Sequence, residues 1–308
     1  MEKNVLYEIK GLYRDNLRVT GYEFGDPDGE EALCIVGSMR GNEIQQLYCT
    51  SQLVKKFKQL EDEERISPGK KILIIPSCNP YSMNIHKRFW PIDNTDINRM
   101  FPGYDLGETT QRIADGVFKQ IKDYEYGIQF TSFYMPGDFM PHVRLMDEGY
   151  SDVETARLFG LPFVVKRAVR PYDTATLNYN WQVWDTKAYS LYTTTTTRID
   201  ARSAGMAVLS VLRFASALGI VVYREGAKHH SKVIEDSELI SIQTAKSGIF
   251  EGLVKAGDTV AEGTPLANII NPYDGEIMET LYAPKEAIVF FIHNDPLTYA
   301  NTAVIKLI

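Results

Sequence analysis

The residues of this 308-residue chain that could perform chemistry are few, and they are not spaced as metal ligands usually are. The odd, sparse cysteines suit a reducing compartment better than a disulfide framework: Cys34, Cys49 and Cys78. The five histidines are equally scattered: His86, His142, His229, His230 and His293. We expect the last three to be ordinary surface residues, and we expect neither of the first two to hold a metal.

Arg40 and Glu43 are the pair with the clearest physical consequence. They lie in the segment 37–43 (GSMRGNE), directly after an apolar run. Arginine is always protonated and has no lone pair to donate to a metal. Its charge also repels a dication, and the three-residue spacing allows it to pair with Glu43. One carboxylate beside such a cation is not expected to hold a divalent metal.

Three stretches carry a resemblance to a known family. Residues 37–43 are similar to a "G-x-x-H-G-x-E" motif. Residues 76–80 (PSCNP), Arg88 and residues 96–103 (DINRMFPG) resemble "P-x-x-N-P … R … D-x-N-R-x-F-P-G". Residues 126–132 (YGIQFTS) are similar to "Y-x-I-D-L-H-T". Together they resemble the succinylglutamate desuccinylase/aspartoacylase branch of the zinc carboxypeptidase fold, and the resemblance extends over nearly the whole chain.

This resemblance implies a zinc hydrolase whose metal ligands and general base have mostly been replaced. Such enzymes hold zinc with three protein ligands, leave one position for water, and use a Glu as general base. By resemblance the three ligand positions are Arg40, Glu43 and Thr131, so only the carboxylate remains. The strand expected to supply the catalytic Glu reads SLYTTTT over 190–196 and contains no acid. We therefore predict that zinc and other cofactors are absent, and we assign no catalytic residue.

The same resemblance implies an anion-binding group that is retained. Arg88, Asn98 and Arg99 would bind the carboxylate of an amino-acid-like ligand, and two guanidiniums with an amide suit that recognition. Arg40 would add a further positive charge. The alternative is that Asn98 and Arg99 only brace the loop before Pro102.

Composition limits the classes of partner. The chain has 33 Lys and Arg against 40 Asp and Glu, a net charge of −7, and no basic block. This balance argues against nucleic acid or an anionic membrane as the main partner. The polar N-terminus (MEKNVLYEIKGLYRD) predicts neither a signal peptide nor a membrane span, so we expect a cytoplasmic protein.

The elements that must position these residues follow an α/β pattern. Apolar runs at 31–38 and 71–78 predict buried strands, and helical spacing over 44–60 predicts a helix between them. Further signals predict helices at 109–123, 152–160 and 203–218, and strands at 127–134, 162–167, 188–197 and 219–223. We expect a mixed, mostly parallel sheet flanked by helices over residues 1–225, as in zinc carboxypeptidases.

The character of the sequence changes after about residue 225. Short strands broken by Gly, Asp, Asn and Pro predict a small all-β domain over residues 226–308. Residues 257–266 (GDTVAEGTPL) resemble a turn of biotinyl/lipoyl barrel-sandwich domains, and Ala283-Pro284 matches a later turn. The carrier lysine of those modules is missing, so we expect a role in packing or homo-oligomerisation.

Two functions remain after these observations. In the first, the protein is a non-catalytic binder of a small carboxylate ligand or of a partner. In the second, it is a hydrolase (deacylase) that cleaves the amide bond of N-acyl amino acids with an atypical site. Replacement of both histidine ligands and loss of the general base favour the first.

Overall fold

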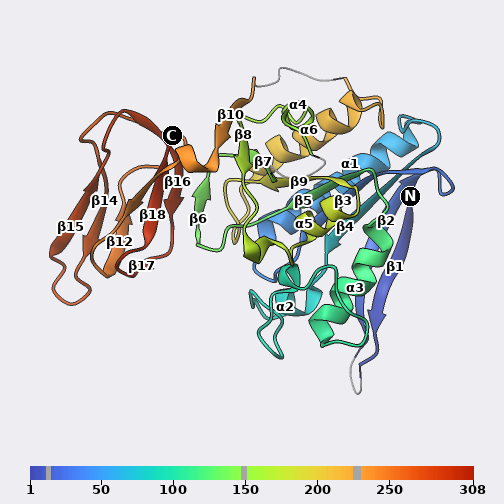
Figure 1. Cartoon of the computed structure of the whole chain (residues 1–308), viewed down its shortest axis with the longest axis horizontal. Helices are drawn as coiled ribbons and strands as arrows, with labels where there is room; N and C mark the ends of the chain where they lie inside the picture. The colour runs from blue at the N-terminus through green and yellow to red at the C-terminus, as the bar shows by residue number, and fades with distance from the viewer. Residues whose placement is uncertain (12–14, 147–150, 225–229) are drawn as a thin grey trace.

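The computed structural model describes residues 1–11, 15–146, 151–224 and 230–308. A large mixed sheet flanked by helices lies beside a smaller group of antiparallel strands (Figure 1). The predicted fold class is therefore confirmed. Within the described ranges, none of the helices is long and apolar enough to cross a membrane.

The large sheet has nine strands in the order β1-β2-β4-β3-β5-β9-β7-β8-β10. Its strands are β1 (Glu2–Ile9), β2 (Leu17–Gly25), β3 (Glu30–Ser38), β4 (Lys70–Ser77), β5 (Tyr126–Phe130), β7 (His142–Met146), β8 (Phe163–Arg167), β9 (Lys187–Tyr192) and β10 (Lys232–Glu235). The central pairings β4-β3-β5-β9 are parallel, whereas β1-β2, β2-β4 and β9-β7 are antiparallel. The sheet is thus mixed around a parallel centre.

The chain reverses its direction of winding at β3. From β3 it passes through α1 (Ile44–Asp62) to β4 on one side, and later returns to β5 on the other side of β3. In open α/β sheets, connections that leave two neighbouring strands in opposite directions open a crevice at the carboxyl ends of those strands. The fold therefore creates a place for a ligand where β3 and β5 end.

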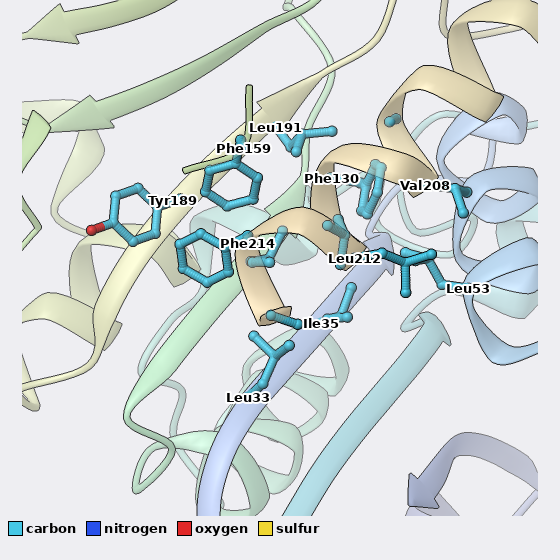
Figure 2. Packing of buried hydrophobic residues seen from close by; sticks show 14 of the residues in the cluster. Leu33, Ile35, Leu53, Phe130, Phe159, Tyr189, Leu191, Val208, Leu212 and Phe214 are labelled. Atoms are coloured by element: carbon cyan, nitrogen blue, oxygen red, sulfur yellow. The ribbon is translucent and has the colours of Figure 1, made fainter. Parts of the chain in front are cut away.

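Helices cover both faces of the sheet centre. Leu33 and Ile35 of β3 pack in one core with α1 and α6 (Ala201–Ala217), as Figure 2 shows. Cys34 and Val36 alternate with them and pack in a second core with α3 (Thr109–Ile121) and α5 (Leu177–Val183). Burial on both faces explains why β3 reads as a continuous apolar run rather than an alternating one.

The C-terminal strands form two antiparallel sheets. One contains β11 (Ile240–Gln243), β18 (Ala303–Leu307), β16 (Ala287–His293) and β13 (Thr259–Val260), and the other contains β15 (Ile277–Tyr282), β14 (Pro265–Ile270), β12 (Gly248–Gly252) and β17 (Leu297–Thr298). β6 (Gly137–Phe139) leaves the large domain and pairs with β16 (Figure 1). An aromatic cluster including Phe133, Phe139, Phe290 and Phe291 packs at this junction.

The expected domain boundary at 225/226 lies outside the described residues. The first strand after it, β10, pairs with β8 and so extends the large sheet. The two parts of the chain thus exchange a strand each, because β6 joins the C-terminal sheet while β10 joins the large one.

Several local predictions need correction. The strand expected at 219–223 is wrong, because Gly219 turns the chain with a φ of 71° and only Val221 forms an isolated bridge, to Ile66. The helix expected at 152–160 is limited to α4 (Val153–Arg157). Elements of the large domain that the sequence did not predict include the strands β1, β2, β6 and β7 and the helix α5. Shorter elements that it did not predict include α2 (Pro80–Asn84) and the 3₁₀ helices η1 (Ile97–Arg99), η2 (Pro171–Asp173) and η3 (Asp236–Glu238). The three cysteines are free and buried.

Candidate ligand-binding site

A cavity of about 190 Å³ lies where β3 and β5 end. Arg40 reaches it from the loop after β3, and Thr131 reaches it from the residues after β5. Asn98 and Arg99 contribute from η1, so four of the six predicted site residues line one cavity. Side chains from β7, β8, β9 and the C-terminal strand β18 complete its wall.

Arg40 occupies the centre of a buried ion-pair network. Its Nη1 donates to Oε1 of Glu43 at 2.9 Å, while its Nε and Nη2 donate to Oδ2 of Asp96 at 3.1 and 2.8 Å. Burial alone would lower the pKa of the Arg40 guanidinium, but attraction to Glu43 and Asp96 outweighs it and holds that pKa above its ordinary value. Two carboxylates therefore fix one guanidinium, which is only 5% exposed.

Glu43 has no free acceptor position for another ligand. Besides Arg40 Nη1, its carboxylate accepts from the Met39 amide at 2.7 Å, the Arg40 amide at 3.0 Å and the Ser132 hydroxyl at 2.6 Å. A carboxylate offers about four lone-pair positions. These four donors use them, so Glu43 serves to hold the Arg40 loop and Ser132 in place.

The loop that carries Arg40 is also held by the neighbouring loop of Lys87 and Arg88. The Gly41 amide donates to the carbonyl of Arg88 at 3.1 Å. A Cβ at Gly41 would lie 2.2 Å from the Lys87 carbonyl oxygen, so only glycine fits there. The glycine of the first motif thus lets two loops touch, and it is needed for packing whatever residue precedes it.

The donor set at these positions does not fit zinc. Arg40 has no lone pair, Glu43 is fully engaged, and Thr131 presents a neutral hydroxyl that is buried without a hydrogen-bond partner. Among the residues described, no three or more His, Cys, Asp or Glu side chains are grouped as a metal site would need. The arrangement instead places a guanidinium where a metal-binding histidine would be expected from the resemblance.

The remaining predicted residues are held differently from one another. The side chain of Asn98 is oriented by Gln129, whose Nε2 donates to its Oδ1 at 2.9 Å. Arg99 donates to the Tyr172 carbonyl at 2.5 Å and keeps 38% of its side chain exposed. Arg88 is not among the described residues that line the cavity, and its Nη2 donates to the carbonyl of Phe133 at 3.2 Å. Arg99 therefore faces the cavity, whereas Arg88 supports a neighbouring loop.

The sequence reasoning missed four basic residues of the cavity: Arg144, Arg167, Arg170 and Lys306. Arg144 lies on β7 and Arg167 ends β8, while Lys306 belongs to β18. The described residues that line the cavity include six cationic side chains and two carboxylates, Asp173 and Asp236. The signal that was available is an arginine within an otherwise apolar strand, as in His142-Val143-Arg144-Leu145-Met146.

The histidines lie away from the ion-pair network. His142 is fully buried, its ring stacks on Tyr192 at 4.6 Å, and its Nδ1 lies 2.8 Å from the Met140 carbonyl. His293 is buried at 7% exposure against Phe250, so its expected surface position is wrong. His230 is exposed as expected, and His229 lies outside the described residues.

The comparison with family models agrees with the motifs. Residues 30–130 match the model described as the succinylglutamate desuccinylase/aspartoacylase catalytic domain. This segment contains β3, β4, β5 and the Arg40, Glu43, Asn98 and Arg99 positions. The chain therefore resembles the succinylglutamate desuccinylase/aspartoacylase family, as its motifs predict. A search of curated proteins finds no significant match.

Solved structures share the fold over nearly the full chain. A succinylglutamate desuccinylase from Silicibacter sp. TM1040 matches with a TM-score of 0.80 and 17% identity over 98% of this chain and 92% of that one. The product-bound ectoine utilization protein EutE (DoeB) from Ruegeria pomeroyi matches with a TM-score of 0.78 and 18% identity, over 95% of this chain and 89% of that one. An aspartoacylase family protein from Mesorhizobium loti matches with a TM-score of 0.76 and 21% identity, over 97% of this chain and 91% of that one.

Proposed function

We propose that this protein is a non-catalytic binder of a small carboxylate-bearing ligand, seated in the cavity at the ends of β3 and β5. The observation that carries the proposal is the position of Arg40. Its guanidinium is tied to Glu43 and Asp96 at the place where the motif would supply a zinc ligand. These ion pairs neutralise the charges of Glu43 and Asp96 without a metal. Zinc binding is therefore not part of the proposed function.

Carboxylate binding is supported by the cavity's charge. The chain as a whole is acidic, with a net charge of −7, yet the described wall of the cavity is dominated by cations. Arg99 is half exposed at this wall, so its remaining N–H donors can reach a ligand. A fixed guanidinium pairs with a carboxylate through two parallel hydrogen bonds. Asn98, already oriented by Gln129, lies beside it.

One observation favours hydrolysis as the second candidate. The Ser132 hydroxyl donates to Glu43 at 2.6 Å, and a hydroxyl beside a carboxylate is the minimum of an activated nucleophile. However, Glu43 already accepts three other hydrogen bonds, so it is poorly placed to take a proton as well. The stretch 190–196, where the resemblance would place the general base, contains no acidic residue.

Two measurements on the full chain separate the candidates. A carboxylate binder should show a melting temperature that rises with malonate or an N-acetyl-amino acid, but not with chloride at equal ionic strength. A ligand at about 100 times its dissociation constant adds about 2.7 kcal/mol of stability. Hydrolysis of N-acetyl- and N-succinyl-amino acids should be undetectable. Turnover that is lost in both Ser132→Ala and Glu43→Ala would overturn the proposal in favour of the hydrolase.

A further inference from the structure

Among the described residues that line the cavity, Arg144 and Lys306 are the two cations without a carboxylate oxygen within 4.0 Å. Arg40 pairs with Glu43 and Asp96, Arg167 pairs with Asp173 at 2.6 Å, and Arg170 lies 3.6 Å from Asp236. Throughout the described chain, no Asp or Glu oxygen lies within 4.0 Å of Arg144 or Lys306. A buried or half-buried charge without a partner costs free energy, so such groups gather at functional sites.

Arg144 is held rigidly in this position. Its guanidinium lies over the Tyr192 ring at 4.6 Å, and its Nη1 lies 3.4 Å from the Tyr192 hydroxyl. Tyr192 is itself held in place, because its ring stacks on the buried ring of His142 with an interplanar angle of 7°. The Nε of Arg144 is buried and has no hydrogen-bond partner among the described residues. The guanidinium is thus oriented before any ligand arrives, which reduces the entropy cost of binding.

Lys306 approaches the same place from the C-terminal sheets. It lies on β18, opposite Phe291 of β16, and its ammonium lies over the Phe133 ring at 5.5 Å. Burial lowers the pKa of this ammonium, and Arg144, Arg170 and Arg167 lower it further against the opposing attraction of Asp236. The positive charges therefore repel one another when the cavity is empty of an anion.

We propose that Arg144 and Lys306 form a second subsite, which binds a dianionic phosphate group. Two unpaired positive charges match a group with two negative charges, and a phosphate monoester carries about −1.5 to −2 at pH 7. Arg144 supplies a planar fork for two phosphate oxygens, and Lys306 supplies a point charge. A single carboxylate would leave one of the two cations unpaired.

The subsite narrows the class of ligand. It rests on the proposed function, in which Arg99 of the same cavity takes the carboxylate. The ligand is then a small acid that carries both a carboxylate and a phosphate. A volume of about 190 Å³ limits it to a compact molecule, below the ~300 Å³ at which drug-sized sites begin.

Calorimetric titration of the full chain with inorganic phosphate, acetate and phosphoglycolate, at constant ionic strength, tests the subsite. We expect phosphate to bind at least about tenfold more tightly than acetate. Lys306→Gln and Arg144→Gln should each weaken phosphate binding by about tenfold or more. The exposed-site variants Lys285→Gln and Arg202→Gln are the matched controls and should bind as the parent does.

The melting temperature of unliganded Lys306→Gln shows whether a loss of phosphate binding comes from poor folding instead. If Lys306 is repelled by its neighbours, unliganded Lys306→Gln should melt at the parent's temperature or above it. A large fall in melting temperature for Lys306→Gln would assign Lys306 a structural role and overturn the proposal.

The two proposals fail in different ways. Binding of acetate that depends on Arg99, without tighter binding of phosphate, would overturn the subsite and leave the carboxylate site standing. Phosphate binding that depends on Arg144 and Lys306, with no gain for phosphoglycolate and no effect of Arg99→Gln, would support the subsite and overturn the carboxylate site. Binding unchanged in both subsite variants would contradict the subsite.

Discussion

Arg40 Nη1 donates to Glu43 Oε1 at 2.9 Å in a pair whose side chains are only 6% and 1% exposed. The same guanidinium holds Asp96 from a loop 56 residues further along the chain. Three loops therefore meet at this ion pair at the end of β3. They are the loop of Arg40 itself, the loop of Asp96, and the residues after β5, where the Ser132 hydroxyl donates to Glu43.

Replacing Arg40 should destabilise the protein strongly. Arg40→Met would leave Glu43 and Asp96 without their cation, and removing one partner of a buried pair costs about 3–5 kcal/mol. The free energy of unfolding from urea titration measures this. Arg157→Met is the control, because Arg157 pairs with Glu154 at the same spacing but on the surface, where a pair contributes about 0–1 kcal/mol. Equal losses in the two variants would contradict a network role for Arg40.

The sequence predicted the pair of Arg40 with Glu43 but not the pair of Arg40 with Asp96. The three-residue spacing of Arg40 and Glu43 was enough to predict their pairing, which the structure shows. The sequence places Asp96 in the motif of residues 96–103 but does not connect it to Arg40, since no local rule links residues 56 positions apart. The placement of Lys306 depends on how β16 pairs with β6, a contact between distant segments that periodicity does not encode.

The errors in the elements also have local causes. The apolar residues 219–223 follow α6 too closely to reach a neighbouring strand, and the Val222 amide bonds only to the Arg65 carbonyl. β9 ends at Tyr192 because the threonines after it turn into the loop, where Thr193 bonds to the Thr195 carbonyl. By contrast, β3 and β4 were predicted well, since their burial on both faces gives long apolar runs.

Arg99 should be needed for the ligand more than for stability. Its side chain is 38% exposed and its contacts are a carbonyl and a distant Asp173, so Arg99→Gln should cost less than about 1 kcal/mol of stability. The carboxylate-dependent rise in melting temperature should disappear in this variant. The exposed-site variant Arg112→Gln should keep the rise. A variant that loses stability while keeping the rise would show that Arg99 braces the loop instead.

Stability should fall on acidification through His142. Burial, followed by the charge of Arg144, lowers the pKa of His142 well below 6.5 in the folded protein. Below pH 6.5 the unfolded chain therefore binds a proton that the folded protein does not, so stability is full above pH 6.5 and is lost toward the folded pKa. The slope reaches at most about 1.4 kcal/mol per pH unit.

Urea titrations between pH 7.5 and 5 measure this dependence. The slope should be reduced in His142→Phe, which keeps a ring to stack on Tyr192. The exposed His230→Gln is the control and should follow the parent. A slope unchanged in His142→Phe would assign the pH dependence to other groups.

Restoring histidines should create a partial metal site. Arg40→His with Thr131→His removes the guanidinium, frees one of the four occupied acceptor positions of Glu43 and supplies the two missing imidazoles. We expect zinc to raise the melting temperature of this double variant and not that of the parent. Arg40→His alone is the control and should gain little. A double variant that gains no zinc would show that these positions do not correspond to the ligand positions of the motif.

The zinc content of the purified parent protein tests the central claim most directly. Elemental analysis of full-length protein prepared without chelator should find far less than one zinc per chain, because Arg40, Glu43 and Asp96 satisfy one another. One zinc per chain, lost in Glu43→Ala, would contradict the account.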